Sequence, residues 1–305
     1  MRLILFLLSF LTILNIHSGT NDLRFNHYDI HKGLSHNTVN CVFQDQKGFM
    51  WFGTNYGLNR FDGTSIKTYL KNEQQNSISN NIIYIIREDT ARHTLWLGTD
   101  NGIVLFDLKT ESFHTLPVST SDGIPINGDI KDFYFDRNGN VWIHNYPRCF
   151  KYNISEKRLE SLDLTLRSPQ KSIPGCLWLD QNDVLWLAYP NIGIGRYDQT
   201  EKQVTLIGKH AHTPLKMYDY GKDSLLIGTL SRGLFAMSKK TGVERKITTE
   251  KTVSTDSLYV NVIQKISNQR YWIGTLTGIY IIEKGKIISQ IQPKWYDPQS
   301  VRWAR

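Results

Sequence analysis

Cysteine is scarce in this chain: among 305 residues there are three, Cys41, Cys149 and Cys176. All three stand in or beside apolar, strand-like runs, and no pair has the CxxC spacing of a structural metal site. We therefore expect no bound metal. Buried free thiols are the expected state of the three cysteines, with a Cys149–Cys176 disulfide as an open alternative.

Catalytic motifs are also lacking. The nine histidines are dispersed without an HExxH pattern, and no GxSxG or phosphate-binding glycine loop occurs. Gly193 and Gly195 precede a strand-like run rather than a helix, which argues against a nucleotide site. The sequence therefore predicts no catalytic residues and no cofactor, and it favours a protein that is not an enzyme.

Clustered charge of one sign is missing too, although the net charge is +8. The longest basic groups are the pairs Lys239-Lys240 and Arg245-Lys246, which we place in turns. A dispersed surplus of this kind is typical of solvated surface. We therefore expect no nucleic acid as a partner of this region.

Long apolar runs are confined to the N-terminus. Residues 1–18 read MRLILFLLSFLTILNIHS, with the positive charge of Arg2 before the run and small Ser18 and Gly19 after it. The run is shorter than the roughly 20 apolar residues that span a membrane, so it predicts a signal peptide over 1–18. An uncleaved anchor is the alternative. No second apolar segment follows, so we expect an exported protein with no membrane span beyond the signal peptide.

What the chain does contain favours strands. Hydrophobic residues make up 40% of it and aromatic residues 12%, including eight tryptophans. Ile, Thr, Tyr, Trp, Asn, Asp and Gly dominate its texture, which is typical of strands joined by tight turns. A chain of this size and composition buries a large core.

A repeat organises almost the whole chain. Six segments align on one core, with anchors at positions 51, 96, 142, 186, 226 and 272, spaced 40 to 46 residues apart. The segments are WFGTNYGLNRFD (51–62), WLGTDNGIVLFD (96–107), WIHNYPRCFKYN (142–153), WLAYPNIGIGRYD (186–198), LIGTLSRGLFAMS (226–238) and WIGTLTGIYIIE (272–283). This period is that of four-stranded propeller blades.

Each repeat resolves into four short strands. The first strand ends at an Asp in four repeats, and the second carries the Trp, which we interpret as a wedge between neighbouring blades. We predict an all-β protein, a β-propeller of four-stranded antiparallel blades over 19–305. The six blades are expected at about 35–70, 78–116, 126–164, 173–207, 214–248 and 258–291. We expect 292–305 to be the stub of a seventh blade, and RFNHYDI at 24–30 to be a fourth strand.

The stretch GLSHNTVNCVFQDQKGFMWFGTNYGLNRFDG at 33–63 resembles the two-component regulator propeller repeat. That resemblance implies the periplasmic sensor region of a hybrid two-component histidine kinase of Bacteroidota, a group of sensors that commonly respond to complex-carbohydrate fragments. It also implies two seven-bladed propellers followed by kinase and receiver modules. This chain departs from that plan, because it has no kinase motifs, no receiver and no full seventh blade. We therefore expect a truncated sensor.

Under this interpretation the partners are an oligosaccharide ligand and either the rest of a sensor kinase or a second copy in a homodimer. Two other functions stay open. One is a propeller enzyme of the virginiamycin B lyase type, which the small number of Glu residues in the predicted loops disfavours. The other is a propeller that binds proteins without catalysis.

Propellers bind ligands on one face near the axis, where the loops converge. The turns between second and third strands supply the candidate ligand residues. They are Asn55, Tyr56, Asp100, Asn101, His144, Asn145, Tyr146, Arg148, Tyr189, Asn191 and Arg232. Blades three and four break the local pattern of the repeat there, which can mark function, although drift of the repeat explains it equally well. Tyr rings stack on sugars, and the two arginines suit an acidic sugar.

Overall fold

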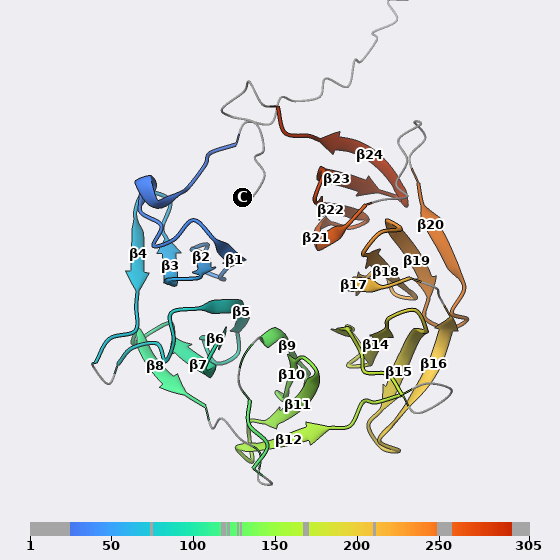
Figure 1. Ribbon diagram of the computed structural model, residues 1–305, viewed down its shortest axis with the longest axis horizontal. Helices are drawn as coiled ribbons and strands as arrows, with labels where there is room; N and C mark the ends of the chain where they lie inside the picture. Colours follow the sequence, from blue (N-terminus) through green and yellow to red (C-terminus); the bar gives the residue numbers. More distant parts are fainter. Residues whose placement is uncertain are drawn as a thin grey trace, which may run out of the picture.

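Six four-stranded sheets are arranged around a ring in the computed structural model (Figure 1). The structure describes residues 25–73, 76–116, 120, 123–126, 128, 130–166, 171–209, 212–248 and 258–294. The predicted all-β propeller with six blades of four antiparallel strands is confirmed. The signal peptide predicted over 1–18 lies outside these residues. So does most of the predicted stub, of which 292–294 are described and form no strand.

The blades follow the repeat in chain order. Blade one contains β1 (Val39–Gln44), β2 (Met50–Thr54), β3 (Gly57–Phe61) and β4 (Ile66–Tyr69), and blade two contains β5 (Ile83–Asp89), β6 (Thr94–Thr99), β7 (Gly102–Asp107) and β8 (Ser112–Thr115). Blade three contains β9 (Ile130–Phe135), β10 (Val141–Asn145), β11 (Arg148–Asn153) and β12 (Arg158–Leu162), and blade four contains β13 (Cys176–Leu179), β14 (Leu185–Tyr189), β15 (Gly193–Asp198) and β16 (Gln203–Lys209). Blade five contains β17 (Pro214–Asp219), β18 (Ser224–Thr229), β19 (Leu234–Ser238) and β20 (Glu244–Ile247), and blade six contains β21 (Val260–Ser267), β22 (Arg270–Thr275), β23 (Gly278–Glu283) and β24 (Lys286–Ile291).

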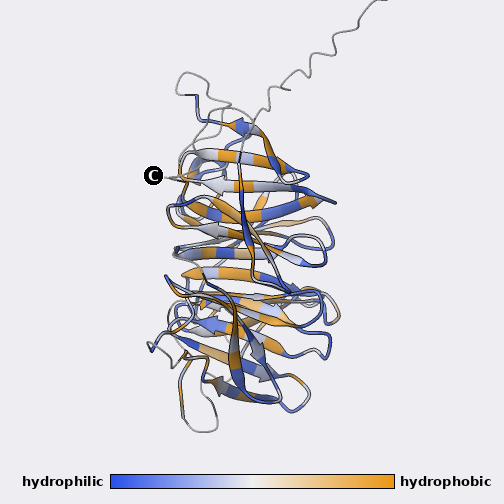
Figure 2. Cartoon of the chain, turned by 90° about the vertical axis from the view of Figure 1, so that its right-hand side faces the viewer, coloured by the Kyte–Doolittle hydropathy of each residue, from blue (hydrophilic) through white to orange (hydrophobic). Residues whose placement is uncertain are grey.

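Each blade is an antiparallel meander whose first strand lies nearest the axis (Figure 1). The first strands contact one another in the order β1, β5, β9, β13, β17 and β21. No comparable contact between strands that the structure describes joins β21 back to β1. Blades one and six are therefore the two ends of this series of six. Turned by 90°, the blades appear as stacked layers, with apolar residues within the strands and polar residues at the turns (Figure 2).

The predicted Trp wedges are found between blades. Trp51, Trp96, Trp142 and Trp186 are each at most 3% exposed. Each lies in a core cluster that it shares with buried residues of the following blade. A glycine two residues after the Trp lets that blade approach: a Cβ on Gly98 would lie 2.9 Å from the Cβ of Ile130 in the next blade. The Trp–x–Gly pattern of the repeat is therefore a packing pattern.

In three blades the Asp at the end of the first strand holds the turn and the Trp together. In blades one, three and four the indole Nε1 of the Trp donates to this Asp, as Trp51 to Asp45 (2.8 Å), Trp142 to Asp136 (3.3 Å) and Trp186 to Asp180 (3.0 Å). In blade two one extra residue separates Asp89 from Trp96, and Asp89 instead pairs with Arg92 at 2.7 Å. The Nε1 of Trp96 has no hydrogen-bond partner in the described part of the chain.

The segment before blade one corrects a prediction. Its described residues 25–29 form no strand, and Ile30–Lys32 is a short 3-10 helix. The Asp29 side chain accepts from the amide of His31 at 3.0 Å, and Gly33 ends the turn with a φ of 101°. Tyr28 packs on Phe61 of β3, with ring centroids 4.8 Å apart. The carbonyl of Asp29 accepts from Lys32 and Leu34 within this turn, and no described strand pairs with residues 25–29.

Candidate functional site

The turns between second and third strands lie on one face of the ring, here called the upper face, because every blade runs in the same direction. The same face holds the connections between blades. Ten of the eleven candidate ligand residues lie in these turns or at the strand ends that flank them, and the eleventh, His144, lies within β10. The two most deeply buried of the eleven are His144, at 3% exposure, and Tyr189, the last residue of β14, at 0%.

Blades one and two present polar side chains that are already tied to their own blades. The Asn55 carboxamide oxygen accepts from Asn40 at 2.9 Å, and the Asp100 carboxylate accepts from the hydroxyl of Tyr84 at 2.9 Å. Asn101 is exposed, with its amide held by the hydroxyl of Thr99. Tyr56 is 50% exposed at the tip of its turn. The tyrosine ring is thus the most available group in these two turns.

Blade three divides its candidates between two cavities. His144 lines a cavity along the ring axis, whereas Arg148 lines a separate pocket of about 400 Å³ beside β12 and Asp163. Asn145 is 5% exposed, and Tyr146 is 49% exposed. The rings of His144 and Tyr146 have centroids 6.5 Å apart. Tyr146 therefore lies at the rim above the histidine, and its peptide bond to Pro147 is cis.

Blades four and five contribute less than the sequence suggests. Tyr189 is fully buried, and its hydroxyl donates to the carbonyl of Leu164 at 2.6 Å, so its ring supports the core between blades three and four. Asn191 is exposed in a left-handed turn conformation with a φ of 59°. Arg232 is exposed, and the hydroxyl of Thr229 holds its amide at 3.0 Å. A surface ligand can reach Asn191 and Arg232 but not Tyr189.

A cavity of about 900 Å³, here called the central channel, lies between the first strands of the blades. Its charged lining residues are Arg87, Lys131, Lys216 and Asp132. Arg87 and Asp132 form an ion pair at 2.8 Å. Burial by itself lowers the pKa of Arg87, but the adjacent Asp132 carboxylate raises it above its usual value. Lys131 lies on β9 and Lys216 on β17, and the formal charges of these four lining residues sum to +2 (three cations less one carboxylate).

An aromatic group lines the channel below this charge. The ring of Trp178 lies 5.8 Å from that of Tyr134 and 4.6 Å from that of Tyr218. Tyr134 donates its hydroxyl to the carbonyl of Leu177 at 2.7 Å, and burial, followed by the charge of Asp132, raises its pKa well above 10.0. Trp178 keeps part of its ring exposed, and its Nε1 has no hydrogen-bond partner among the residues described.

The channel residues Lys131, Lys216 and Trp178 are absent from the predicted ligand residues, because the prediction considered turns and not strands. A signal was present: the first strand of a propeller blade lies next to the axis, and Lys131 and Lys216 interrupt first strands that are otherwise mostly apolar. Which of their side chains meet across the ring depends on the rotation between blades, which one repeat does not specify.

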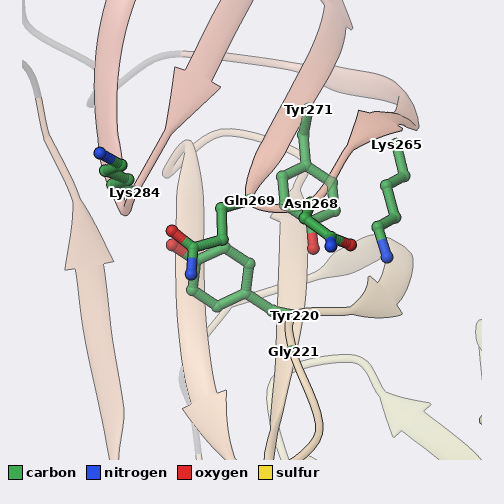
Figure 3. Close-up of a pocket in the computed structure, with 7 residues that line it drawn as sticks. All are labelled: Tyr220, Gly221, Lys265, Asn268, Gln269, Tyr271 and Lys284. Atoms are coloured by element: carbon green, nitrogen blue, oxygen red, sulfur yellow. The ribbon is translucent and has the colours of Figure 1, made fainter.

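A second pocket lies on the lower face, between blades five and six. It has a volume of about 540 Å³ and is formed by the turns after β17 and β21 together with Lys284. Tyr220 and Tyr271 lie side by side with centroids 5.5 Å apart, and Lys265 and Lys284 lie on opposite sides of them (Figure 3). Tyr271 donates to the carbonyl of Asp219 at 3.1 Å. None of the predicted ligand residues lines this pocket.

Comparison with known families agrees with the architecture. Residues 33–56, which cover β1, β2 and the following turn, match the family model described as two component regulator propeller. The match therefore covers the first half of blade one, and β3 and β4 lie beyond it. The family resemblance expected from residues 33–63 is thus confirmed, and the other five blades are built on the same plan as this repeat. No curated protein matches the chain in sequence.

Solved structures with this repeat fold extend the likeness to nearly the whole chain. The extracellular domain of the hybrid two component system BT4673 from B. thetaiotaomicron is 19% identical, with a TM-score of 0.72, over 92% of this chain and 36% of that one. PorZ of Porphyromonas gingivalis, a surface component of the type-IX secretion system, is 16% identical, with a TM-score of 0.62, over 87% of this chain and 42% of that one. YCF48 from Cyanidioschyzon merolae is 11% identical, with a TM-score of 0.56, over 77% of this chain and 79% of that one.

At these identities the likeness is one of fold. This chain spans well under half the length of the first two structures. Within the residues that the structure describes, no helix is long and apolar enough to cross a membrane. The comparisons therefore show a propeller fold over most of the chain and a two component regulator propeller match within its first blade.

Proposed function

We propose that this propeller is the ligand-sensing domain of an exported, periplasmic two-component signalling protein, and that it binds a carbohydrate fragment at its upper face. The propeller repeat and the fold of the hybrid two-component extracellular domain support the sensing role. The carbohydrate is supported by one observation: the exposed ring of Tyr146 lies 6.5 Å from that of His144, which lines a channel whose wall is both aromatic and charged.

The rim and channel have the components that saccharide sites use. An exposed tyrosine offers an apolar ring face to the C–H face of a sugar, and exposed amide, carboxylate and guanidinium groups pair with hydroxyls. Asn101, Asn191 and Arg232 lie in turns of the same face and are exposed. Tyr189, being buried, is not part of the proposed site.

Signalling output is the further part of this proposal. A sensor domain acts by favouring one arrangement of the protein it belongs to, so the ligand must bind two arrangements with different affinity. We propose that the rest of a sensor kinase, or a second copy of this propeller, receives that change. The role is one of binding without turnover, and release of a shortened or unsaturated product from any glycan would contradict it.

The test is titration of the protein with a panel of glycan fragments by calorimetry, with Tyr146→Ala as the variant. Loss of a stacking ring is expected to weaken a bound glycan about tenfold, which corresponds to ~1.4 kcal/mol. Tyr220→Ala, in the lower-face pocket, is the matched control and should leave affinity unchanged. If only the Tyr220 variant weakens binding, the upper-face site is wrong while glycan binding stands.

A further inference from the structure

The lower-face turns of blades five and six depart from the repeat together. In blades one, three and four an Asp lies six residues before the anchor Trp and accepts from its indole. Blade five has Tyr220 and Leu226 at these two positions, and blade six has Ile266 before Trp272. Blade six also has Tyr271 where every other blade has an aliphatic residue or Met before the anchor. A repeat that breaks its local rule in two adjacent blades points to a role for the pocket of about 540 Å³ between them.

Polar turns of blade six form the rim of this pocket. Asn268 and Gln269, the two-residue turn between β21 and β22, are exposed and lie between Lys265 and Lys284 (Figure 3). The amide of Lys284 donates to the carbonyl of Gln269 at 3.1 Å, so the turn after β23 is held against the turn after β21. This bond fixes both turns where their side chains flank one cavity.

The hydroxyl of Tyr220 lies beside a further cation. A Cβ on Gly285 would lie 3.1 Å from this hydroxyl and 3.1 Å from the Nη2 of Arg245, so both groups border the space that Gly285 leaves. Burial raises the pKa of Tyr220, and the charge of Arg245 lowers it by less. The hydroxyl therefore keeps its proton and donates. Tyr271 beside it is 1% exposed, so Tyr220 is the ring of the pair that a bound group can reach.

The pocket lining is positive in the part of the chain that the structure describes. Lys265 and Lys284 are exposed, and neither forms an ion pair with a described residue. The carboxylates of Asp219 and Glu283, which adjoin pocket residues in the chain, are paired with other cations at 2.6 and 2.8 Å. Asp223 is exposed in the turn after β17 but does not line the pocket. The two ammonium groups, on opposite sides of the tyrosines, therefore attract carboxylates spaced along an extended chain.

We infer that this lower-face pocket docks an acidic segment of a partner protein, with Lys265 and Lys284 pairing with two of its carboxylates across the tyrosine pair. The carboxamides of Asn268 and Gln269 offer donors and acceptors alike, which a peptide backbone uses and a simple polyanion does not. The ring of Tyr220 packs on the aliphatic stems of the segment. The lower face is opposite the proposed carbohydrate site, so both can be occupied together. The inference goes beyond the proposed function and does not depend on it.

The experiment is titration of the whole chain with a fluorescein-labelled peptide of alternating Glu and Gly, followed by fluorescence anisotropy, with a peptide of alternating Gln and Gly as the neutral match. Lys265→Ala and Lys284→Ala should each weaken binding of the Glu peptide about threefold, the loss expected for one partly solvated ion pair. The Glu peptide should accordingly bind about tenfold more tightly than the Gln peptide, and more weakly as ionic strength rises. Lys47→Ala, in the turn after β1 on the same face, removes the same charge outside the pocket and should change nothing.

Equal binding of the two peptides, or equal affinity in the Lys265→Ala and Lys47→Ala variants, would overturn the inference. Tyr146→Ala should leave peptide binding unchanged, and a loss there would contradict the lower-face site. Binding of a heparin fragment in place of the Glu peptide, with the same dependence on Lys265, would rule out a peptide partner. If glycans bind and the Glu peptide does not, the docking site fails while the proposed function stands. If the Glu peptide binds with dependence on both lysines and no glycan binds, the docking site stands and the carbohydrate proposal fails.

Discussion

The Asp–Trp lock gives a direct test of how the blades are held together. In blade one the Nε1 of Trp51 donates to Asp45 at 2.8 Å, and both residues are at most 5% exposed. In blade two the Nε1 of Trp96 has no partner in the described chain, because Asp89 is one residue out of register. The two tryptophans are equally buried wedges with opposite hydrogen-bond status. Replacing each by Phe therefore separates the hydrogen bond from the packing.

Trp51→Phe removes a charge-assisted hydrogen bond and leaves a buried carboxylate oxygen with one partner fewer. Such bonds contribute roughly 1.5–3 kcal/mol, and the lost ring volume adds about 1 kcal/mol. Trp96→Phe loses the same volume but also removes an unsatisfied buried N–H, whose cost is about 1–3 kcal/mol. We expect Trp51→Phe to lower the free energy of unfolding by about 3 kcal/mol and Trp96→Phe to change it by ~1 kcal/mol or less.

The assay is equilibrium unfolding in urea, followed by circular dichroism because the substitutions alter fluorescence. Trp142→Phe is an intermediate control, since its bond to Asp136 is longer at 3.3 Å. Equal losses for Trp51→Phe and Trp96→Phe would refute the reasoning. That result would mean that the wedge acts through volume alone.

Two further predictions concern packing and acid stability. Gly98→Ala forces a Cβ to 2.9 Å from the Cβ of Ile130 in the next blade, and should lower the free energy of unfolding in urea by about 2 kcal/mol. In Gly274→Ala the new Cβ meets the half-exposed Val262 of its own blade, so the loss should be smaller. His144 has a pKa of about 3 in the folded chain against 6.5 as its ordinary value, so it contributes stability above pH 6.5 that is lost as pH falls toward 3. The loss of unfolding free energy is on the order of 4 kcal/mol. The test is the midpoint of urea unfolding, measured from pH 7 to pH 3, and this midpoint should fall less with pH in His144→Gln than in the wild type.

Much of the fold could be predicted from the sequence because the repeat is a packing rule. The Trp wedge and the glycine two residues later act between adjacent blades, so their spacing predicts both the strands and their order. The Asp at the strand end is equally local, since its carboxylate bonds amides two and four residues on, as Asp45 does with Lys47 and Phe49. The same pair of bonds recurs at Asp136 and Asp180, so this short-range pattern can be recognised in the sequence.

The site was less predictable because it depends on contacts between strands far apart in the chain. Tyr189 has the residue type of a sugar-stacking group, yet its hydroxyl bonds a carbonyl 25 residues away and its ring is buried. Lys239 has the pattern of a solvated turn, yet it lies between Asp180 at 2.7 Å and Asp219 at 2.6 Å. No periodicity within one blade shows that neighbouring blades supply those partners.

The sequence by itself determined the blade, because a wedge, a glycine and a capped turn act within about 50 residues of chain. It also indicated the upper face, because the direction of each strand follows from the repeat. Only the tertiary structure decided which side chains meet at the axis. Lys131 and Lys216 stand 85 residues apart in the chain. Their charges come together at His144 because the ring brings first strands of separate blades around one channel.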